Sequence, residues 1–146
     1  MHKPYGAISM NTVKNLPELF LARLHMFEGE PCLRFKEEGA YRDILWEEVF
    51  TIISHLSAGL AQIGIRKDDK VALLSENRPE WMYADLAVLS LGAITVPIFP
   101  TYPRREVEYI IKHSEARAVF VSHARQWKKL ERLSAQQGSL LTVISF

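Results

Sequence analysis

A glycine-spaced segment is the first pattern in this sequence that could do chemistry. Residues 59–64 read Gly-Leu-Ala-Gln-Ile-Gly, the spacing that opens a phosphate-gripping P-loop. A P-loop continues with lysine and then serine or threonine, whereas Ile65 and Arg66 follow here. The segment also ends a predicted helix, where the free backbone amides do not point toward an anion. We therefore reject a phosphate-binding role for it.

Histidines and paired carboxylates are the other side chains that could hold a metal or transfer protons. The five histidines are His2, His25, His55, His113 and His123. No two of them have ligand spacing on one helix, and no carboxylate partner for a catalytic triad is apparent. The acidic pairs at 37–38, 47–48 and 68–69 fall in predicted turns or at a helix start, where carboxylates stabilise backbone dipoles. The sequence predicts no catalytic, cofactor-binding or metal-ligating residue in this chain.

The segment Glu76-Asn77-Arg78-Pro79-Glu80-Trp81 is the most distinctive stretch. Asn77 followed three residues later by Glu80 is the spacing of a capping box, and Pro79 suits a first helical turn. A helix is therefore predicted to start near residue 78. The other tryptophans, Trp46 and Trp127, begin or line apolar helix faces and are interpreted as core anchors.

These residues lie within a regular alternation of strands and helices. Two short runs around Glu37-Glu38-Gly39 predict a β-hairpin. Apolar residues at steps of three and four predict helices, and short apolar runs predict buried strands. The predicted helices cover 46–63, 78–91, a segment through Val107, Ile110 and Ile111 that starts after Thr101 or Pro103, and a segment through Trp127, Leu130 and Leu133; the predicted strands cover 71–75, 93–99, 116–122 and 140–145.

This alternation predicts an α/β fold with three layers and a mostly parallel sheet, preceded by the hairpin. Residues 1–30 are interpreted as a lead-in with a short helix that starts at Thr12 or Asn15. Residues 31–146 are expected to form one α/β unit.

Composition and charge restrict the class of protein. With 48% hydrophobic and 24% charged residues, the 146-residue chain has the composition of an ordinary globular protein. A net charge of +1 argues against binding to nucleic acid or to an anionic membrane surface. The short basic runs Arg104-Arg105 and Lys128-Lys129 are interpreted as solvated helix faces. The single Cys32 excludes an internal disulfide, so a reducing, cytoplasmic setting is expected.

A membrane span is the alternative reading of residues 81–100, whose only charge is Asp85. The helix start near residue 78, the stop at Gly92 and the β-branched run Ile94-Thr95-Val96 closed by Pro97 favour a buried helix followed by a buried strand.

Five ordered blocks resemble adenylate-forming acyl-CoA synthetases of the AMP-binding family, closest to the long-chain fatty-acid type. The blocks are 42–49, 64–72 with Asp68 where glycine is usual, 76–81, 91–98, and 106–121. The resemblance runs from about Thr12 to the end of the sequence. It implies the first subdomain of the ligase fold.

The resemblance also implies a reaction for the parent enzyme. ATP adenylates a fatty acid with release of pyrophosphate, and the thiol of coenzyme A then displaces AMP; both steps require Mg²⁺ and a preorganised phosphate-binding loop. The family's Ser/Thr/Gly-rich loop ending in lysine does not occur among these 146 residues. The chain is therefore interpreted as a fragment cut before the nucleotide-binding loop, which by itself binds none of the cofactors and forms no adenylate.

Two further hypotheses stay open. One is a binding or assembly module that self-associates through the apolar run 140–144. The other is a flavodoxin-like nucleotide or phosphate binder, since doubly wound sheets bind ligands at their switch point. Peripheral membrane contact is a separate expectation, for the parent enzyme of the resembled family.

Overall fold

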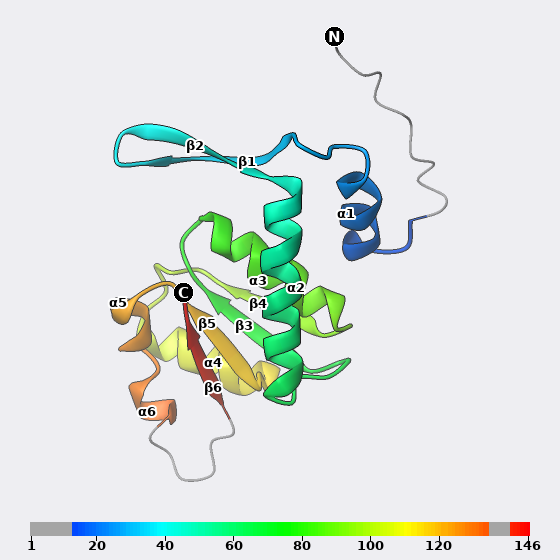
Figure 1. Cartoon of the computed structure of the whole chain (residues 1–146). Helices are drawn as coiled ribbons and strands as arrows, with labels where there is room; N and C mark the ends of the chain where they lie inside the picture. Colours follow the sequence, from blue (N-terminus) through cyan, green and yellow to red (C-terminus); the bar gives the residue numbers. More distant parts are fainter. Residues whose placement is uncertain (1–12, 135–140) are drawn as a thin grey trace.

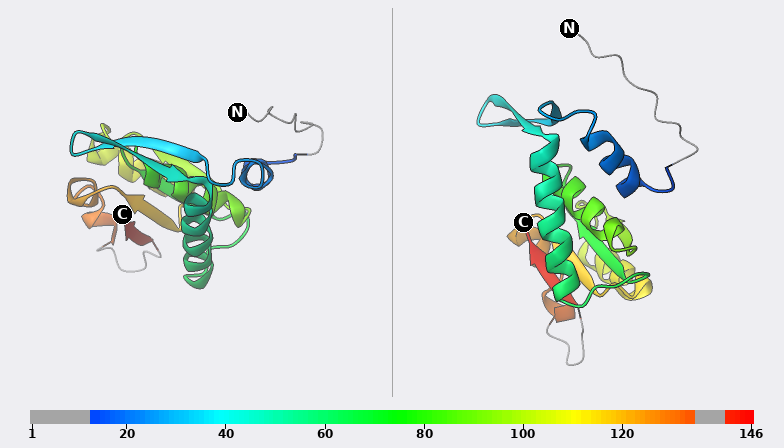
Figure 2. Two further views of the ribbon diagram at one scale, coloured as in Figure 1. Left: turned by 45° about the horizontal axis from the view of Figure 1, so that its top comes forward. Right: turned by 45° about the vertical axis from the view of Figure 1, so that its right-hand side comes forward.

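The computed structural model describes residues 13–134 and 141–146. The N-terminal elements are α1 (Leu16–Leu24), β1 (Pro31–Glu37), β2 (Ala40–Leu45) and α2 (Trp46–Gln62). Of the two starts predicted for the first helix, Asn15 is the N-cap, and its side chain accepts a hydrogen bond of 2.9 Å from the Glu18 amide; Thr12 lies outside the described residues. The antiparallel hairpin β1–β2 extends away from the rest of the chain (Figure 1 and Figure 2).

The rest of the chain alternates strand and helix as predicted. Its elements are β3 (Lys70–Leu74), α3 (Pro79–Ser90), β4 (Ile94–Ile98), α4 (Arg104–Ser114), β5 (Ala118–Val121), α5 (Ala124–Trp127), α6 (Glu131–Ser134) and β6 (Thr142–Ser145). Pro103 is the N-cap of α4, which decides between the two predicted starts. Residue 140 of the predicted last strand lies outside the described residues.

The four strands of the main sheet are parallel and run in the order β4-β3-β5-β6. Successive side chains of a strand point to opposite faces, so each strand contributes to two apolar clusters. On β3, Val71 and Leu73 pack with α2 and α3, whereas Ala72 and Leu74 pack with α4 and the segment of α5 and α6. The predicted three-layer α/β fold is confirmed.

Two predictions in this region are wrong. The single helix expected through Trp127, Leu130 and Leu133 is two four-residue helices, α5 and α6. Trp127 is 38% exposed and does not anchor the core, because the buried position in that turn belongs to Gln126. The half-buried Trp46 instead packs between the ring of Phe20, with centroids 5.1 Å apart, and that of Phe27 at 5.7 Å.

The membrane-span alternative for residues 81–100 is wrong as well. This stretch holds most of α3, a turn at Gly92 and then β4. Within the described residues, no helix combines the length and the apolar character needed to cross a bilayer.

Candidate functional site

The carboxyl ends of β3, β4 and β5 meet at one edge of the sheet. The chain leaves β3 through α3 to reach β4 on one side, and then crosses through α4 to β5 on the other side of β3. Connections that depart to opposite sides create the switch point at which parallel sheets bind ligands. The residues directly after these strands are therefore the candidates for function.

Glu76, the second residue after β3, joins this edge to β5 and α5. Its carboxylate accepts hydrogen bonds from the hydroxyl of Ser122 and from Nε2 of Gln126, the latter at 2.8 Å. Nε2 of His123 lies 3.2 Å from its Oε1. Burial acts to raise the pKa of Glu76, but the hydrogen bonds from Ser122, from its own backbone amide and from Gln126, with the charge of His123, together lower it to about 2. Glu76 is thus a structural carboxylate and stays ionised.

Arg78 fixes the start of α3. Two of its guanidinium nitrogens each donate to Glu80 at 2.7 Å, and a third donates to the carbonyl of Ser122 at 3.3 Å. Its guanidinium carbon lies 5.7 Å from the ring centre of Phe146. The hydrogen bond with Arg78 lowers the pKa of Glu80, against the effect of burial.

The capping box predicted for Asn77 and Glu80 is wrong, and the N-cap lies one residue later than Asn77. Arg78 is the N-cap of α3, with an extended backbone at φ −157° and no side-chain cap, and Pro79 occupies the first turn as predicted. Glu80 pairs with Arg78 instead of capping through Asn77. Asn77 is exposed and has no hydrogen-bond partner among the described residues, so it is the one polar side chain of this motif left free for another molecule.

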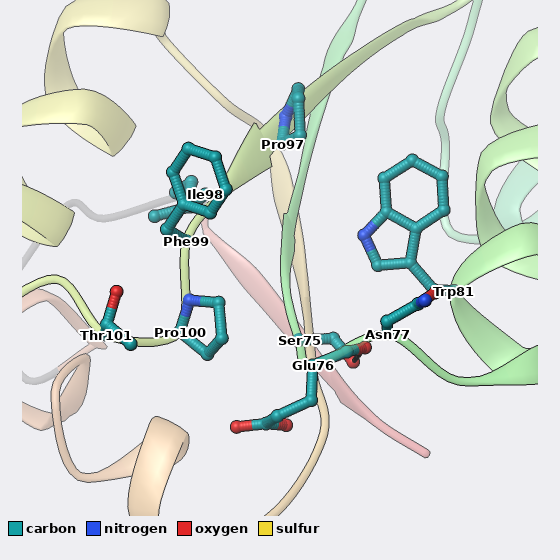
Figure 3. A pocket seen from close by; sticks show the side chains of 9 residues that line it. All are labelled: Ser75, Glu76, Asn77, Trp81, Pro97, Ile98, Phe99, Pro100 and Thr101. Atoms are coloured by element: carbon teal, nitrogen blue, oxygen red, sulfur yellow. Dashed lines mark hydrogen bonds between the residues drawn. The ribbon is translucent and has the colours of Figure 1, made fainter.

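A hollow of about 520 Å³ lies between the carboxyl ends of β3 and β4. Its lining is mainly apolar, and it consists of Ser75, Glu76, Asn77, Trp81, Pro97, Ile98, Phe99, Pro100 and Thr101. Figure 3 shows Trp81 and Phe99 on opposite sides of this space, with Asn77 beside the tryptophan. Phe99 is 67% exposed. An apolar space with a free amide at its side suits a narrow organic substrate better than a bare anion.

A second hollow of about 340 Å³ adjoins the first and shares Glu76, Pro100 and Thr101 with it. Lys129 lines it, and its Nζ donates to the carbonyls of Pro100 at 2.6 Å and Tyr102 at 2.8 Å. Desolvation, aided by the charge of Arg125, lowers the pKa of Lys129. The lysine thereby holds the loop after β4 in place.

The residues considered for chemistry in the sequence occupy structural positions. Gly59 lies within α2, and Gly64 follows the helix at φ +92°. Glu48 accepts a hydrogen bond of 2.8 Å from the Leu45 amide at the start of α2. Asp68 has φ +68°, the backbone region that favours glycine.

The histidines and acids do not converge on a metal. Among residues 13–134 and 141–146, no three histidine, cysteine or carboxylate side chains are placed to share an ion. His113 stacks on Tyr109 with ring centroids 5.4 Å apart. Sequence reasoning missed the cluster of His123, Ser122 and Gln126 around Glu76, because 46 and 50 residues separate Glu76 from Ser122 and Gln126. The available signal was that Glu76 directly follows one predicted strand, 71–75, and Ser122 is the last residue of another, 116–122.

Comparison with known families decides the ancestry of the chain. The profile of the family described as AMP-binding enzyme matches residues 20–145. This chain belongs to the AMP-binding enzyme family. The predicted resemblance is thereby confirmed.

Several characterised members are long-chain ligases. The chain is 34% identical over 90 residues to the long-chain-fatty-acid–CoA ligase FadD15 of Mycobacterium bovis, covering 60% of this chain and 15% of that protein. It is 29% identical over 146 residues to long chain acyl-CoA synthetase 4 of Arabidopsis thaliana, covering 100% of this chain and 21% of that protein. The chain thus spans about a fifth or less of the length of these AMP-binding relatives.

Solved structures similar to this chain agree with the fold. The N-terminal subdomain of Klebsiella oxytoca NpsA in complex with 3-hydroxybenzoyl-AMSN superposes with a TM-score of 0.72 at 25% identity, covering 91% of this chain and 30% of that one. The same subdomain with 3-hydroxyanthranilyl-AMSN gives a TM-score of 0.73 and covers 99% of this chain and 33% of that one. The sheet, its helices and the hairpin therefore match an adenylation N-terminal subdomain.

Proposed function

We propose that this chain forms the N-terminal part of a ligase that joins a long-chain fatty acid to coenzyme A. The support is its membership of the AMP-binding family together with its similarity to long-chain ligases of bacteria and plants. In the proposed reaction, ATP with Mg²⁺ adenylates the fatty acid, and coenzyme A then displaces AMP. We expect this reaction to take place in the cytoplasm.

The observation that carries the proposal is the apolar hollow at the carboxyl ends of β3 and β4. Trp81 and Phe99 offer apolar walls to a substrate chain, and the unpartnered Asn77 offers an amide. Glu76 and Arg78 both follow β3, and both form hydrogen bonds with Ser122, which directly follows β5. The contribution of this segment is therefore to shape and support the substrate site.

Phosphate chemistry is not assigned to any residue of this chain. Within the described residues, no three histidine, cysteine, aspartate or glutamate side chains are grouped so that they could hold a metal ion. The lysine-terminated loop that the family uses does not occur in the 146 residues. We therefore propose that the chain alone forms no adenylate.

Two assays test this function. The purified chain, given ATP, Mg²⁺ and palmitate, should release no pyrophosphate; palmitate-dependent release would overturn the proposal of inactivity. Sequencing the source DNA downstream of the Phe146 codon then shows whether the reading frame runs on into a lysine-terminated Ser/Thr/Gly-rich loop.

A chimera tests the substrate-site role directly. In this chimera, residues 20–145 replace the matching segment of the Mycobacterium bovis ligase. We expect the chimera to retain palmitoyl-CoA synthesis. Within that chimera, Trp81→Ala should lower synthesis strongly, whereas Lys36→Gln on the exposed hairpin should leave it unchanged. A Trp81→Ala chimera with the parent chimera's activity would show that the hollow is not part of the site.

A second candidate, an assembly module, rests on the two edges of the sheet. The edge strand β4 contains Pro97, which lacks an amide and blunts strand pairing, whereas the other edge strand, β6, contains neither proline nor charge. An unprotected edge favours pairing between two copies. Light scattering over a wide range of concentrations should then show a dimer that Val143→Lys makes monomeric; a monomer at every concentration would remove this candidate.

A further inference from the structure

The two helical layers around the sheet carry opposite charge. Helices α2 and α3, here the acidic layer, contain no lysine or arginine and four carboxylates, a net charge of −4. Residues 104–114 and 124–134, here the basic layer, contain seven lysines and arginines and three glutamates, a net charge of +4. The chain's net charge of +1, which by itself argues against an anionic membrane surface, conceals this separation.

Within the basic layer, three cations form a stripe that faces solvent. Hydrogen bonds from the Lys128 amide to Ala124, from Leu130 to Trp127 and from Leu133 to Leu130 keep the chain nearly helical from α5 into α6. The buried positions are Gln126, Leu130 and Leu133. Arg125, Lys128 and Arg132 are all exposed and, at helical spacing, occupy the opposite side of this segment. These three residues are the cationic stripe.

The cationic stripe is not used to hold the fold together. Lys129 turns inward to the loop after β4, and Arg104 donates to the carbonyl of Lys128 and lies 3.8 Å from Glu131. The side chains of Arg125, Lys128 and Arg132, by contrast, have no ion pair or hydrogen bond to another described residue. The prediction that Lys128 and Lys129 share one solvated face is therefore wrong, because only Lys128 lies outward.

Two further features point to an anionic partner. Arg105 is exposed in the first turn of α4, where the helix dipole disfavours a cation, so its charge contributes nothing to the helix. Two large aromatic side chains of the same layer are also exposed, Trp127 by 38% and Tyr109 by 64%. Tryptophan and tyrosine among cations are typical of surfaces that meet the headgroup region of a bilayer.

We propose that the basic layer binds the surface of an anionic phospholipid bilayer. Arg105 and the cationic stripe contact headgroup phosphates, and Trp127 enters the interface beside them. The acidic layer is repelled by the same surface, so the charge separation orients the protein as well as binding it. The proposal deepens the proposed function, because a long-chain fatty acid partitions into bilayers and an enzyme held at that surface meets it there.

Vesicle co-flotation of the whole 146-residue chain tests this. We expect binding to phosphatidylcholine vesicles that contain phosphatidylserine, little binding to phosphatidylcholine alone, and loss of binding at high salt. The variant with Arg125→Gln, Lys128→Gln and Arg132→Gln should bind on the order of 100-fold more weakly, since each cation near an anionic surface contributes about a factor of five. The matched control, Lys14→Gln, Lys36→Gln and Arg42→Gln, removes the same charge just before α1 and on the hairpin, and it should bind like the parent chain.

A second measurement needs no charge change. Brominated lipid in the anionic vesicles should quench the fluorescence of the parent chain, and Trp127→Phe should remove most of that quenching. Equal binding by the stripe variant and its control would overturn the proposal, as would equal binding to neutral vesicles. Preferential capture by DNA or by an acidic protein at the same salt would also overturn it. None of these readouts depends on ligase activity. The basic layer can therefore bind vesicles even if the proposed ligase function is wrong, and the ligase function can hold even if the basic layer does not bind vesicles.

Discussion

The acidic and basic layers cover one sheet and differ in what they do with their side chains. The acidic layer has the larger apolar cluster, built from two long helices against β3 and β5. The basic layer has one long helix and two short ones, and its smaller cluster leaves several cations outside. A parallel sheet needs apolar cover on both faces, but the outer surface of each layer is free to differ. Packing and surface charge are therefore separable properties of this fold.

The largest expected effect tests the packing half of this comparison. Phe120 and Val119 are adjacent in β5, fully buried, and face the acidic and basic layers respectively. Phe120→Ala should lower the free energy of unfolding by about 3–5 kcal/mol, since a large cavity opens where the ring stacks on Phe146. Val119→Ala should cost roughly 2 kcal/mol. Urea unfolding of both variants measures the difference, and equal costs would contradict an unequal division of the core.

Arginines that join elements within each layer give the next effect. Arg78 combines a two-point contact with Glu80, the Ser122 carbonyl and the Phe146 ring. Arg78→Ala should cost about 1–2 kcal/mol of unfolding free energy, and Arg78→Lys should recover only part of it because ammonium lacks the planar fork. Arg104→Ala in the basic layer, which loses one carbonyl contact and a distant carboxylate, should cost about 0.5–1 kcal/mol. A larger loss of unfolding free energy for Arg104→Ala than for Arg78→Ala would show that the stronger arginine contact lies in the basic layer.

Glu76 links the end of β3 to the basic layer through α5, and its contribution depends on pH. Because its pKa falls from 4.5 to about 2 on folding, its stabilisation is complete above pH 4.5 and is lost as the pH falls toward 2. The half-exposed carboxylate is screened by solvent, so we expect a loss of about 1 kcal/mol. Denaturant unfolding should be measured between pH 5 and pH 2 for the parent chain and for Glu76→Gln. The other carboxylates titrate in both chains, so the parent should lose about 1 kcal/mol more than the variant. The same slope in both would remove Glu76 from its linking position.

The sequence predicted the layers but not the contacts between them. Steps of three and four placed α2 and α4, and continuous apolar runs placed β3 to β5, because both patterns follow from covering a sheet on two faces. Arg78 replaced Asn77 as the N-cap of α3, since contacts with Ser122 and Phe146 outweigh a local preference of about 1 kcal/mol.

Trp127 shows the same limit in the basic layer. Apolar periodicity predicted a buried tryptophan, but Gln126 takes the buried position because its amide donates to Glu76, which lies 50 residues earlier. The charge separation was likewise present in the sequence. It could be found only once the strand order showed which helices share a face.

The smallest effect compares how a helix of each layer ends. In the acidic layer the chain leaves α2 through Gly64 at φ +92°, whereas in the basic layer it leaves α4 through Glu115 at φ +56°. Side chains other than glycine are strained in this left-handed region by about 1 kcal/mol. Gly64→Ala should therefore destabilise the chain by about 1 kcal/mol, although an added methyl would approach no atom closer than 3.9 Å. Glu115→Gly should stabilise it by about 0.5 kcal/mol, since glycine relieves the strain but gains freedom in the unfolded chain. Thermal unfolding of the two variants beside Gly59→Ala, a helix-interior glycine expected to stabilise, would separate backbone strain from side-chain contact; stabilisation by Gly64→Ala would show that the end of α2 does not need the left-handed turn.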